Sequence, residues 1–140
     1  MKAFPNRVWE RENEFLANYK KLAQALIEYR LTSEDIAARS LKNVCLSYLL
    51  NLGERYRYLA LEQYSSANNM TDQLFALQVL VKNGLEQTMP QLDHFYQQWQ
   101  HDPSVVDKWF AIQAIIPDKE ILHRVQTLVK HDAFNQLNID

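Results

Sequence analysis

The chain has 140 residues, of which 47% are hydrophobic and 23% are charged, and this balance is typical of one globular domain with its own core. A formal net charge of −2 provides no field that attracts a phosphate backbone, so we expect no nucleic-acid partner. Only two glycines and four prolines occur, which favours a helical protein and excludes the glycine-rich loops that cradle nucleotides.

The first expected element is a long helix, or two shorter ones, between Asn6 and Arg30. A second helix is predicted to begin after Thr32, because Thr32 and Asp35 match a capping box in which hydroxyl and carboxylate each bind a free backbone amide. The apolar stripe of the first helix consists of Leu16, Tyr19, Ala23, Leu26 and Ile27.

The second helix has apolar residues at steps of three and four, and we expect it to be buried on more than one side. Gly53 is expected to end it as a C-terminal cap. Its stripe consists of Ala37, Leu41, Val44, Cys45, Tyr48 and Leu52, with Leu46 and Leu50 behind them.

Five further helices are expected along the rest of the chain. Turn and cap signals at "SSANNMT", Gly84, the pair Asp102 and Pro103, and Pro117 mark their limits. They run from Glu54 to about Ser66, from Met70 to Gly84, from Pro90 to about His101, from Pro103 to Pro117, and from about Asp118 to Lys130.

One sequence pattern occurs twice. The segment "DQLFALQ" at Asp72 returns as "DKWFAIQ" at Asp107, and the stripes around the two segments also match at an offset of 35 residues. Repetition of whole stripes indicates two copies of a helix-turn-helix unit. The matched stripes are Met70, Leu74, Leu77 and Val81 against Val105, Trp109, Ile112 and Ile116.

The predicted fold is therefore all-α: stacked antiparallel helix pairs in a HEAT/armadillo-like superhelical array of about 6–8 helices. We expect residues 1–140 to form a single helical-repeat domain. Residues 1–31 supply the N-terminal helix or helices, and residues 32–140 supply the stacked pairs.

No set of residues predicts catalysis, cofactor binding or metal binding. No His-x-x-x-His pair occurs, so the histidines are expected at helix ends or on the surface, and Cys45 is expected to be buried and inert. Acidic pairs are expected to lie at helix starts or on charged faces, in the field of the helix dipole. The histidines are His94, His101, His123 and His131, and the pairs are Glu12/Glu14, Glu34/Asp35 and Asp118/Glu120.

The repeated polar residues are assigned structural roles. Asp72 and Asp107 fall in first turns, which favours dipole or capping interactions, and Gln78 and Gln113 are expected to hydrogen-bond between neighbouring helix pairs. The segment from Arg55 to Tyr58 suits base stacking on a nucleic acid, or a half-buried helix face, which we favour. Two interpretations fit the three tryptophans, a binding groove and the core, and we favour the core. They are Trp9, Trp99 and Trp109.

Four segments resemble, in the same order and at about the same intervals, the C-terminal helical domain of bacterial aminopeptidase N, a family of zinc-dependent gluzincin-type aminopeptidases. The resemblance covers roughly residues 32–134. The segments are "AARSLKNVCLSYL" (37–49), "ANNMTD" (67–72), "DKWFAIQA" (107–114) and "HDAF" (131–134).

The resemblance implies a large multi-domain enzyme in which a thermolysin-like domain holds one zinc through a His-Glu-x-x-His helix, and a Gly-x-Met-Glu-Asn segment binds the substrate's amino terminus. Neither motif occurs in this chain, so no catalytic or metal residue is carried over. The family pattern continues with Asn-Pro-Asn, of which only Asn138 matches, before Ile139 and Asp140. We therefore expect an excised part of a longer enzyme, or a short relative of its helical domain.

The resemblance implies a non-catalytic function, in which this segment helps to wall the active-site chamber and to control the access of peptides. The implied partners are the catalytic domain and peptide substrates, and zinc belongs to the parent enzyme. A free-standing helical-repeat module that binds a protein or peptide is the alternative, and a self-sufficient hydrolase is a third. A single cysteine, no segment near the roughly 18 apolar residues of a membrane span, and no secretory signal indicate a cytoplasmic protein without a membrane partner.

Overall fold

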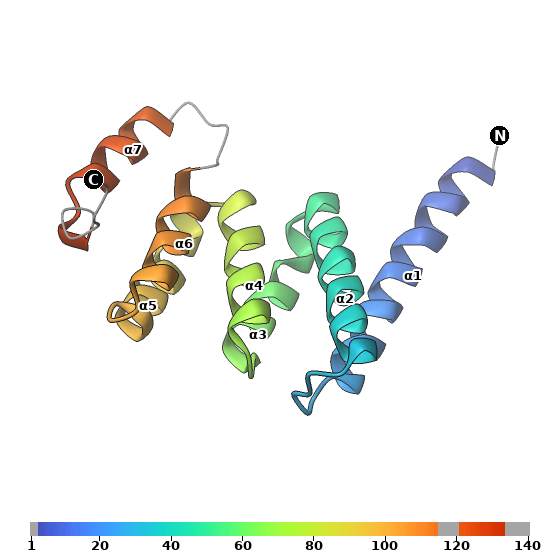
Figure 1. Ribbon diagram of the computed structural model, residues 1–140. Coiled ribbons are helices and arrows are strands. Elements are labelled where there is room, and N and C mark those ends of the chain that lie inside the picture. The colour runs from blue at the N-terminus through green and yellow to red at the C-terminus, as the bar shows by residue number, and fades with distance from the viewer. Residues whose placement is uncertain (1–2, 115–120, 134–140) are drawn as a thin grey trace. The chain divides into compact units, whose positions relative to one another are not determined.

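A computed structural model describes residues 3–114 and 121–133, and the regular structure within these ranges is entirely helical (Figure 1). The all-α prediction is thus confirmed. The helices are α1 (Ala3–Ala25), α2 (Ser33–Leu52), α3 (Arg57–Ser66), α4 (Met70–Lys82), α5 (Met89–Trp99), α6 (Pro103–Ala114) and α7 (Ile121–Val129), with two 3₁₀ turns, η1 (Glu54–Tyr56) and η2 (Glu86–Thr88).

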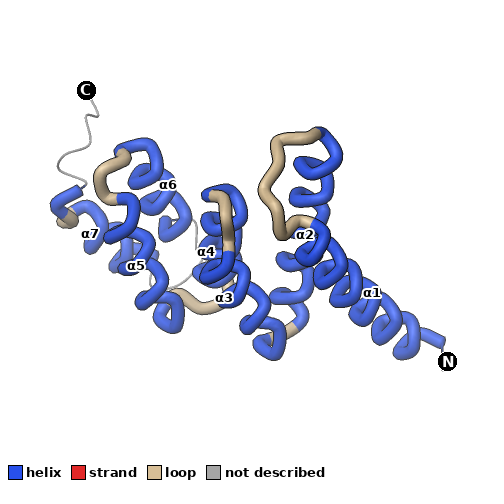
Figure 2. Tube along the Cα trace, turned by 90° about the horizontal axis from the view of Figure 1, so that it is seen from below, coloured by secondary structure: helices blue, strands red, loops and turns tan. Residues whose placement is uncertain are grey.

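The helices cluster into two compact units, Met1–Val79 and Leu80–Asp140. In the first unit α1 packs along α2, and the two helices lie side by side in both views (Figure 1, Figure 2). In the second unit α6 packs on α5 and on α7. Each unit is therefore built from helices that pack against their neighbours along the chain, as predicted for stacked helix pairs.

The start of α2 confirms half of the predicted capping box. The Thr32 hydroxyl accepts the Asp35 backbone N–H at 3.1 Å, so Thr32 is the N-cap. The Asp35 carboxylate does not accept the Thr32 backbone N–H, which is the second hydrogen bond of a capping box. It accepts the Arg30 guanidinium instead, with 2.8 Å between Arg30 Nε and Asp35 Oδ2. Asp35 thus ties the loop before α2 to the helix.

The predicted burial of α2 is wrong on one side. Leu41, Val44 and Tyr48 of the expected stripe are exposed, whereas charged residues occupy the inner side together with Leu46 and Leu49. Ile27, assigned to the stripe of the first helix, lies beyond the end of α1 and is 70% exposed. The buried residues of α2 are Asp35, Arg39, Lys42, Asn43, Cys45, Leu46, Leu49 and Leu50.

Most of the other predicted boundaries agree with the structure. Gly53 is the C-cap of α2, as predicted, and its backbone there is extended, with φ 161° and ψ 166°. Asn69 caps α4, since its Oδ1 accepts the Asp72 N–H at 2.8 Å. The Asp102 carboxylate accepts the N–H of Ser104 at 3.1 Å, and Pro103 is the first residue of α6.

The repeated stripes form core on both α4 and α6. Leu77, Val81, Val105, Trp109 and Ile112 are buried, whereas Leu74 and Met70 are partly exposed. The expected end of the sixth helix at Pro117, the stripe residue Ile116, and the Asp118/Glu120 pair lie outside the described residues. No helix in the described parts of the chain combines the length and the apolar character needed to cross a membrane.

Candidate functional site

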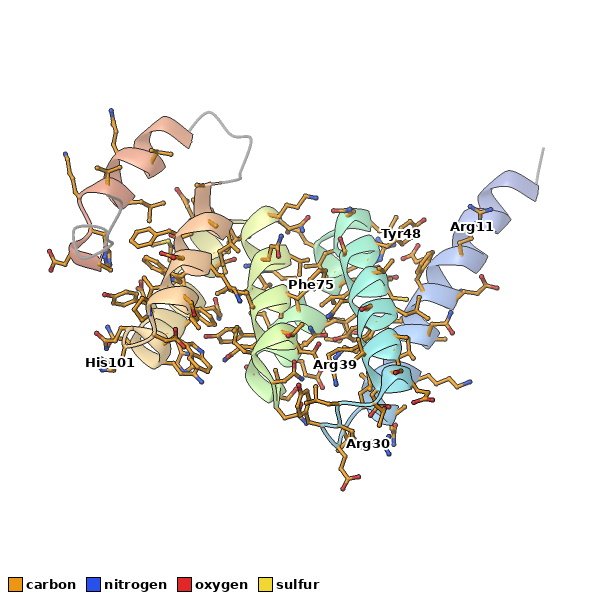
Figure 3. All side chains as sticks on the ribbon, viewed as in Figure 1. Arg11, Arg30, Arg39, Tyr48, Phe75 and His101 are labelled. Carbon is orange, nitrogen blue, oxygen red and sulfur yellow. The ribbon has the colours of Figure 1, made fainter. Side chains whose placement is uncertain are left out.

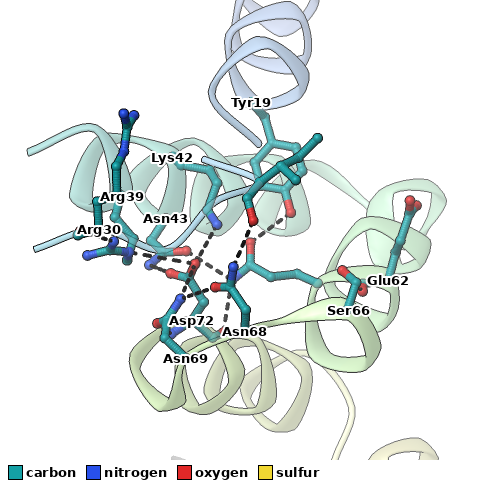
Figure 4. Close-up of polar contacts among 12 residues, drawn as sticks. Tyr19, Arg30, Arg39, Lys42, Asn43, Glu62, Ser66, Asn68, Asn69 and Asp72 are labelled. Carbon is teal, nitrogen blue, oxygen red and sulfur yellow. Dashed lines mark hydrogen bonds and ion pairs between the residues drawn. The ribbon is translucent and has the colours of Figure 1, made fainter. Parts of the chain in front are cut away.

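A buried polar network in the first unit is centred on Asp72, in the first turn of α4 (Figure 4). Its carboxylate accepts Lys42 Nζ at 2.8 Å and Asn43 Nδ2 at 3.2 Å, both from α2. Asn69 Nδ2 lies 3.2 Å from Asp72 Oδ2, and Arg39 Nε lies 3.9 Å from the same oxygen. Both carboxylate oxygens are thus occupied, so Asp72 acts as an anchor for α2 and not as a free base.

Gln63 extends this network from α3 to α1. Its Oε1 accepts the Tyr19 hydroxyl at 2.7 Å, and its Nε2 donates to Asn43 Oδ1 at 3.0 Å and to the Asp72 backbone carbonyl at 2.9 Å. Burial, helped by the charge of Asp72, raises the pKa of Tyr19, so its hydroxyl stays protonated and donates. One side-chain network therefore joins α1, α2, α3 and α4.

Sequence reasoning missed most of this network. It considered Asp72 only as a dipole or capping residue, and it assigned no role to Arg39, Lys42, Asn43 or Gln63. The available signal is their spacing, because Asp35, Arg39 and Lys42 follow one another at steps of four and three and so share one side of a helix. A charged side of that kind is interpreted as solvated unless its partners on other helices are known.

A half-open cavity of about 770 Å³ lies beside the network in the first unit. Tyr19, Lys42, Gln63 and Asp72 contribute polar groups to its lining, and Leu26, Ile27 and Leu59 contribute apolar ones. The lining also includes one exposed cation, Lys20, and one exposed carboxylate, Glu62. The cavity therefore suits an uncharged or zwitterionic chain with both polar and apolar groups.

A second polar cluster joins α1 to η1. The Glu12 carboxylate accepts hydrogen bonds from the Arg55 guanidinium and the Tyr56 hydroxyl. The Arg55 hydrogen bond is the main cause that lowers the pKa of Glu12. Glu12 lies in the middle of α1 and is buried, so the expected explanation by a helix dipole is wrong for this member of the Glu12/Glu14 pair.

In the second unit, Trp109 joins α6 to α5 by a hydrogen bond of 2.9 Å from its Nε1 to the Leu92 carbonyl. The His131 ring lies among three aromatic rings, with centroids 4.8 Å from Tyr96, 5.2 Å from Trp109 and 5.8 Å from Phe110. His131 Nδ1 accepts the Ala133 N–H at 3.0 Å. His131 is thus a half-buried packing residue just after α7, in line with the predicted position at a helix end.

The structure describes several of the other predicted residues and places them in the core or on the surface. Cys45 is buried as predicted, and burial raises the pKa of its thiol. His94 and His101 are exposed, as is Glu14, and the side chains of His123 and Trp9 lie outside the described residues. Within the part of the chain that the structure describes, no three His, Cys, Asp or Glu side chains come together in a way that suits a metal ion.

The polar residues of the repeated segments "DQLFALQ" and "DKWFAIQ" take different roles in the two copies. Asp72 is buried in its network, whereas Asp107 is exposed. Gln78 is exposed, and Gln113 is fully buried but donates within its own helix, to the Trp109 carbonyl at 2.9 Å. The predicted hydrogen bonds of these glutamines between helix pairs are therefore wrong, and the repeat preserves packing and not polar chemistry.

The chain is similar to proteins named aminopeptidase N. It is 44% identical over 126 residues to the Haemophilus influenzae protein, covering 89% of this chain and 14% of that protein. The Escherichia coli protein is 37% identical over 131 residues, covering 92% of this chain and 15% of that one. The Caulobacter vibrioides protein is 35% identical over 111 residues, covering 76% of this chain and 13% of that protein. The chain thus spans about one seventh of these relatives.

A solved structure shares the fold. The chain matches the structure titled "Crystal structure of Legionella pneumophila aminopeptidase A in complex with aspartic acid" with a TM-score of 0.72 and 30% identity, over 86% of this chain and 16% of that one. These similarities confirm the predicted resemblance to the helical domain of aminopeptidases. With a family match that extends over residues 8–138, the chain belongs to the family described as "Domain of unknown function (DUF3458_C) ARM repeats".

Proposed function

We propose that this chain acts as part of the helical domain of an aminopeptidase N-like zinc metallopeptidase, which removes N-terminal residues from peptides. In that setting the segment is non-catalytic, helps to wall the active-site chamber and restricts the access of peptides. The observation that carries the proposal is the similarity to three aminopeptidase N proteins, which covers between 76% and 92% of the chain.

The contacts within the chain support a structural function. Asp72, Glu12 and Gln63 all use their hydrogen-bonding capacity to join helices. Hydrolysis of a peptide bond needs a nucleophile or an activated water, a base, and donors for the oxyanion, held within hydrogen-bonding reach of one another. The described polar clusters are networks of mutually satisfied groups, which favours support of a site made elsewhere.

The implied zinc does not fit the described residues. Zinc sites in peptidases need three protein ligands, usually His and carboxylate, around one point. Within residues 3–114 and 121–133 such a set is not assembled. We therefore assign zinc to the remainder of the proposed enzyme, and derive no step of its chemistry from this chain.

A chimera tests the proposal. The segment of Haemophilus influenzae aminopeptidase N that matches this chain over 126 residues is replaced by the chain, and a deletion variant of the same enzyme lacks the segment. We expect the chimera, but not this chain alone, to hydrolyse an aminoacyl reporter. We also expect the deletion to change the ratio of kcat/KM between a dipeptide and a long peptide, and the chimera to restore it. A folded chimera without activity, or with the ratio of the deletion variant, would contradict the proposal.

The 770 Å³ cavity favours a second candidate function, a free-standing module that binds peptides. Its combination of amide, hydroxyl and apolar lining is what an extended peptide requires. Binding of a labelled peptide library to the isolated chain, weakened by Lys20→Ala or Glu62→Ala at exposed positions of the lining without loss of fold, would support this candidate. Absence of binding up to millimolar peptide, together with an active chimera, would favour the aminopeptidase function.

A further inference from the structure

Helix α2 buries most of its charged residues and exposes several large apolar ones. Three of its four charged residues, Asp35, Arg39 and Lys42, are buried, and after Glu34 its exposed positions carry no charge at all. The α2 outer face, as we define it, consists of Ile36, Ala37, Ser40, Leu41, Val44 and Tyr48, all of which are exposed.

The α2 outer face has the composition of a protein interface. Leu41 and Val44 are 54% and 58% exposed, and Ile36 is 48% exposed. Charge depletion with large apolar and aromatic side chains is the mark of the central part of an interface, whereas solvated helix faces carry charges. Phe15 of α1 stacks on Tyr48 with 4.1 Å between the ring centroids, so the apolar surface continues onto the neighbouring helix.

Figure 3 shows the two sides of α2, with Arg39 toward α4 and Tyr48 toward α1. The core residues of the first unit cover the inner side. On the outer face Tyr48 stacks on Phe15, whereas Ile36, Ala37, Ser40, Leu41 and Val44 remain exposed within that unit. Ala37, Leu41, Val44 and Tyr48 alternate at steps of four and three, the spacing with which one helix packs along another. The spacing therefore suits a helical partner surface.

We propose that the α2 outer face docks against an uncharged, apolar helical surface in the remainder of the aminopeptidase polypeptide. This inference rests on the proposed function. The area of the face decides between that partner and a second copy of the chain. A handful of half-exposed apolar side chains offers on the order of 300 Å², whereas a stable dimer buries about 800 Å² on each partner.

A separate copy would also lose its translational and rotational freedom on binding. A surface in the same polypeptide is held at high effective concentration and needs less contact area. The relatives contain such additional polypeptide, because the chain matches only 14% and 15% of the first two. The small area and the lack of charge thus favour a covalently continuous, apolar partner.

The test uses Leu41→Glu and Val44→Glu in the isolated chain and in the Haemophilus influenzae chimera. Gln97→Glu, an exposed position on α5, is the matched control. In the isolated chain all three variants should melt like the unsubstituted chain, because each site faces solvent. In the chimera, Leu41→Glu and Val44→Glu should increase the rate at which a protease releases the segment by at least about tenfold, since burying an unpaired charge costs more than a tenfold change in equilibrium. Gln97→Glu should leave that rate unchanged.

The outcomes separate this inference from the function on which it rests. An active chimera in which Leu41→Glu and Val44→Glu behave like Gln97→Glu overturns the docking surface and leaves the proposed function standing. An inactive unsubstituted chimera overturns both. Loss of stability in the isolated Leu41→Glu chain would show that Leu41 belongs to the chain's own core, which also overturns the docking surface.

Discussion

Single residues in this chain have roles that depend on burial more than on the local sequence. Asp72 and Asp107 begin the same seven-residue pattern, and both lie in a helix of similar length. Only Asp72 is enclosed, with Lys42, Asn43 and Asn69 on its carboxylate. A buried ion pair contributes little net stability, but the loss of one partner leaves the other charge buried and unpaired.

We therefore expect Asp72→Asn to destabilise the chain by about 3–5 kcal/mol, since Lys42 would remain buried without its counter-charge. Urea denaturation followed by circular dichroism measures the change. Asp107→Asn is the matched control, and as an exposed substitution it should change stability by no more than about 0.5 kcal/mol. Equal effects of the two substitutions would show that the Asp72 network does not anchor α2.

Trp109 provides a second test at this scale, in the other unit. Trp109→Ala should cost about 3–5 kcal/mol, because the ring is 4% exposed and packs on Tyr96 and His131. Trp109→Phe keeps much of that packing but loses the donor to the Leu92 carbonyl, so we expect a smaller loss, of about 1–3 kcal/mol. An unchanged melting temperature of the Ala variant would contradict the core role of Trp109.

At the scale of elements, the sequence predicted where helices begin and end better than which side they bury. Caps are local, so Thr32 and Asp102 could be identified from a few neighbouring residues. Burial depends on partners that are distant in sequence. Lys42 meets Asp72, which is 30 residues away, and no local pattern reveals that pairing. The outer face of α2 has a regular apolar stripe, and periodicity alone cannot distinguish a core face from a docking face.

The cluster that joins α1 to η1 predicts that the stability of the folded chain depends on pH. The Arg55 hydrogen bond lowers the pKa of Glu12 from its ordinary value of 4.5, so folding favours the ionised form. The resulting stability is present above pH 4.5 and is lost as the pH falls through the lowered pKa of the folded state. Thermal melting from pH 7 to pH 2 should therefore show a smaller acid-induced loss for Glu12→Gln than for the unsubstituted chain.

Glu14→Gln, an exposed carboxylate of the same helix, is the control for this experiment. It should retain the acid-induced loss of the unsubstituted chain. If Glu12→Gln and Glu14→Gln show the same dependence on pH, the Glu12 carboxylate does not link α1 to η1 in solution.

At the scale of the whole molecule, the question is whether the apolar face of α2 makes the isolated chain associate with itself. A patch on the order of 300 Å² is below what a stable dimer buries, and no charges on the face are available to pair with a second copy. We therefore expect a monomer at micromolar concentrations by sedimentation velocity, with Leu41→Glu sedimenting identically. A concentration-dependent dimer that Leu41→Glu abolishes would make a second copy the partner of this face, and the docking surface inferred above would then belong to an oligomer and not to a longer enzyme.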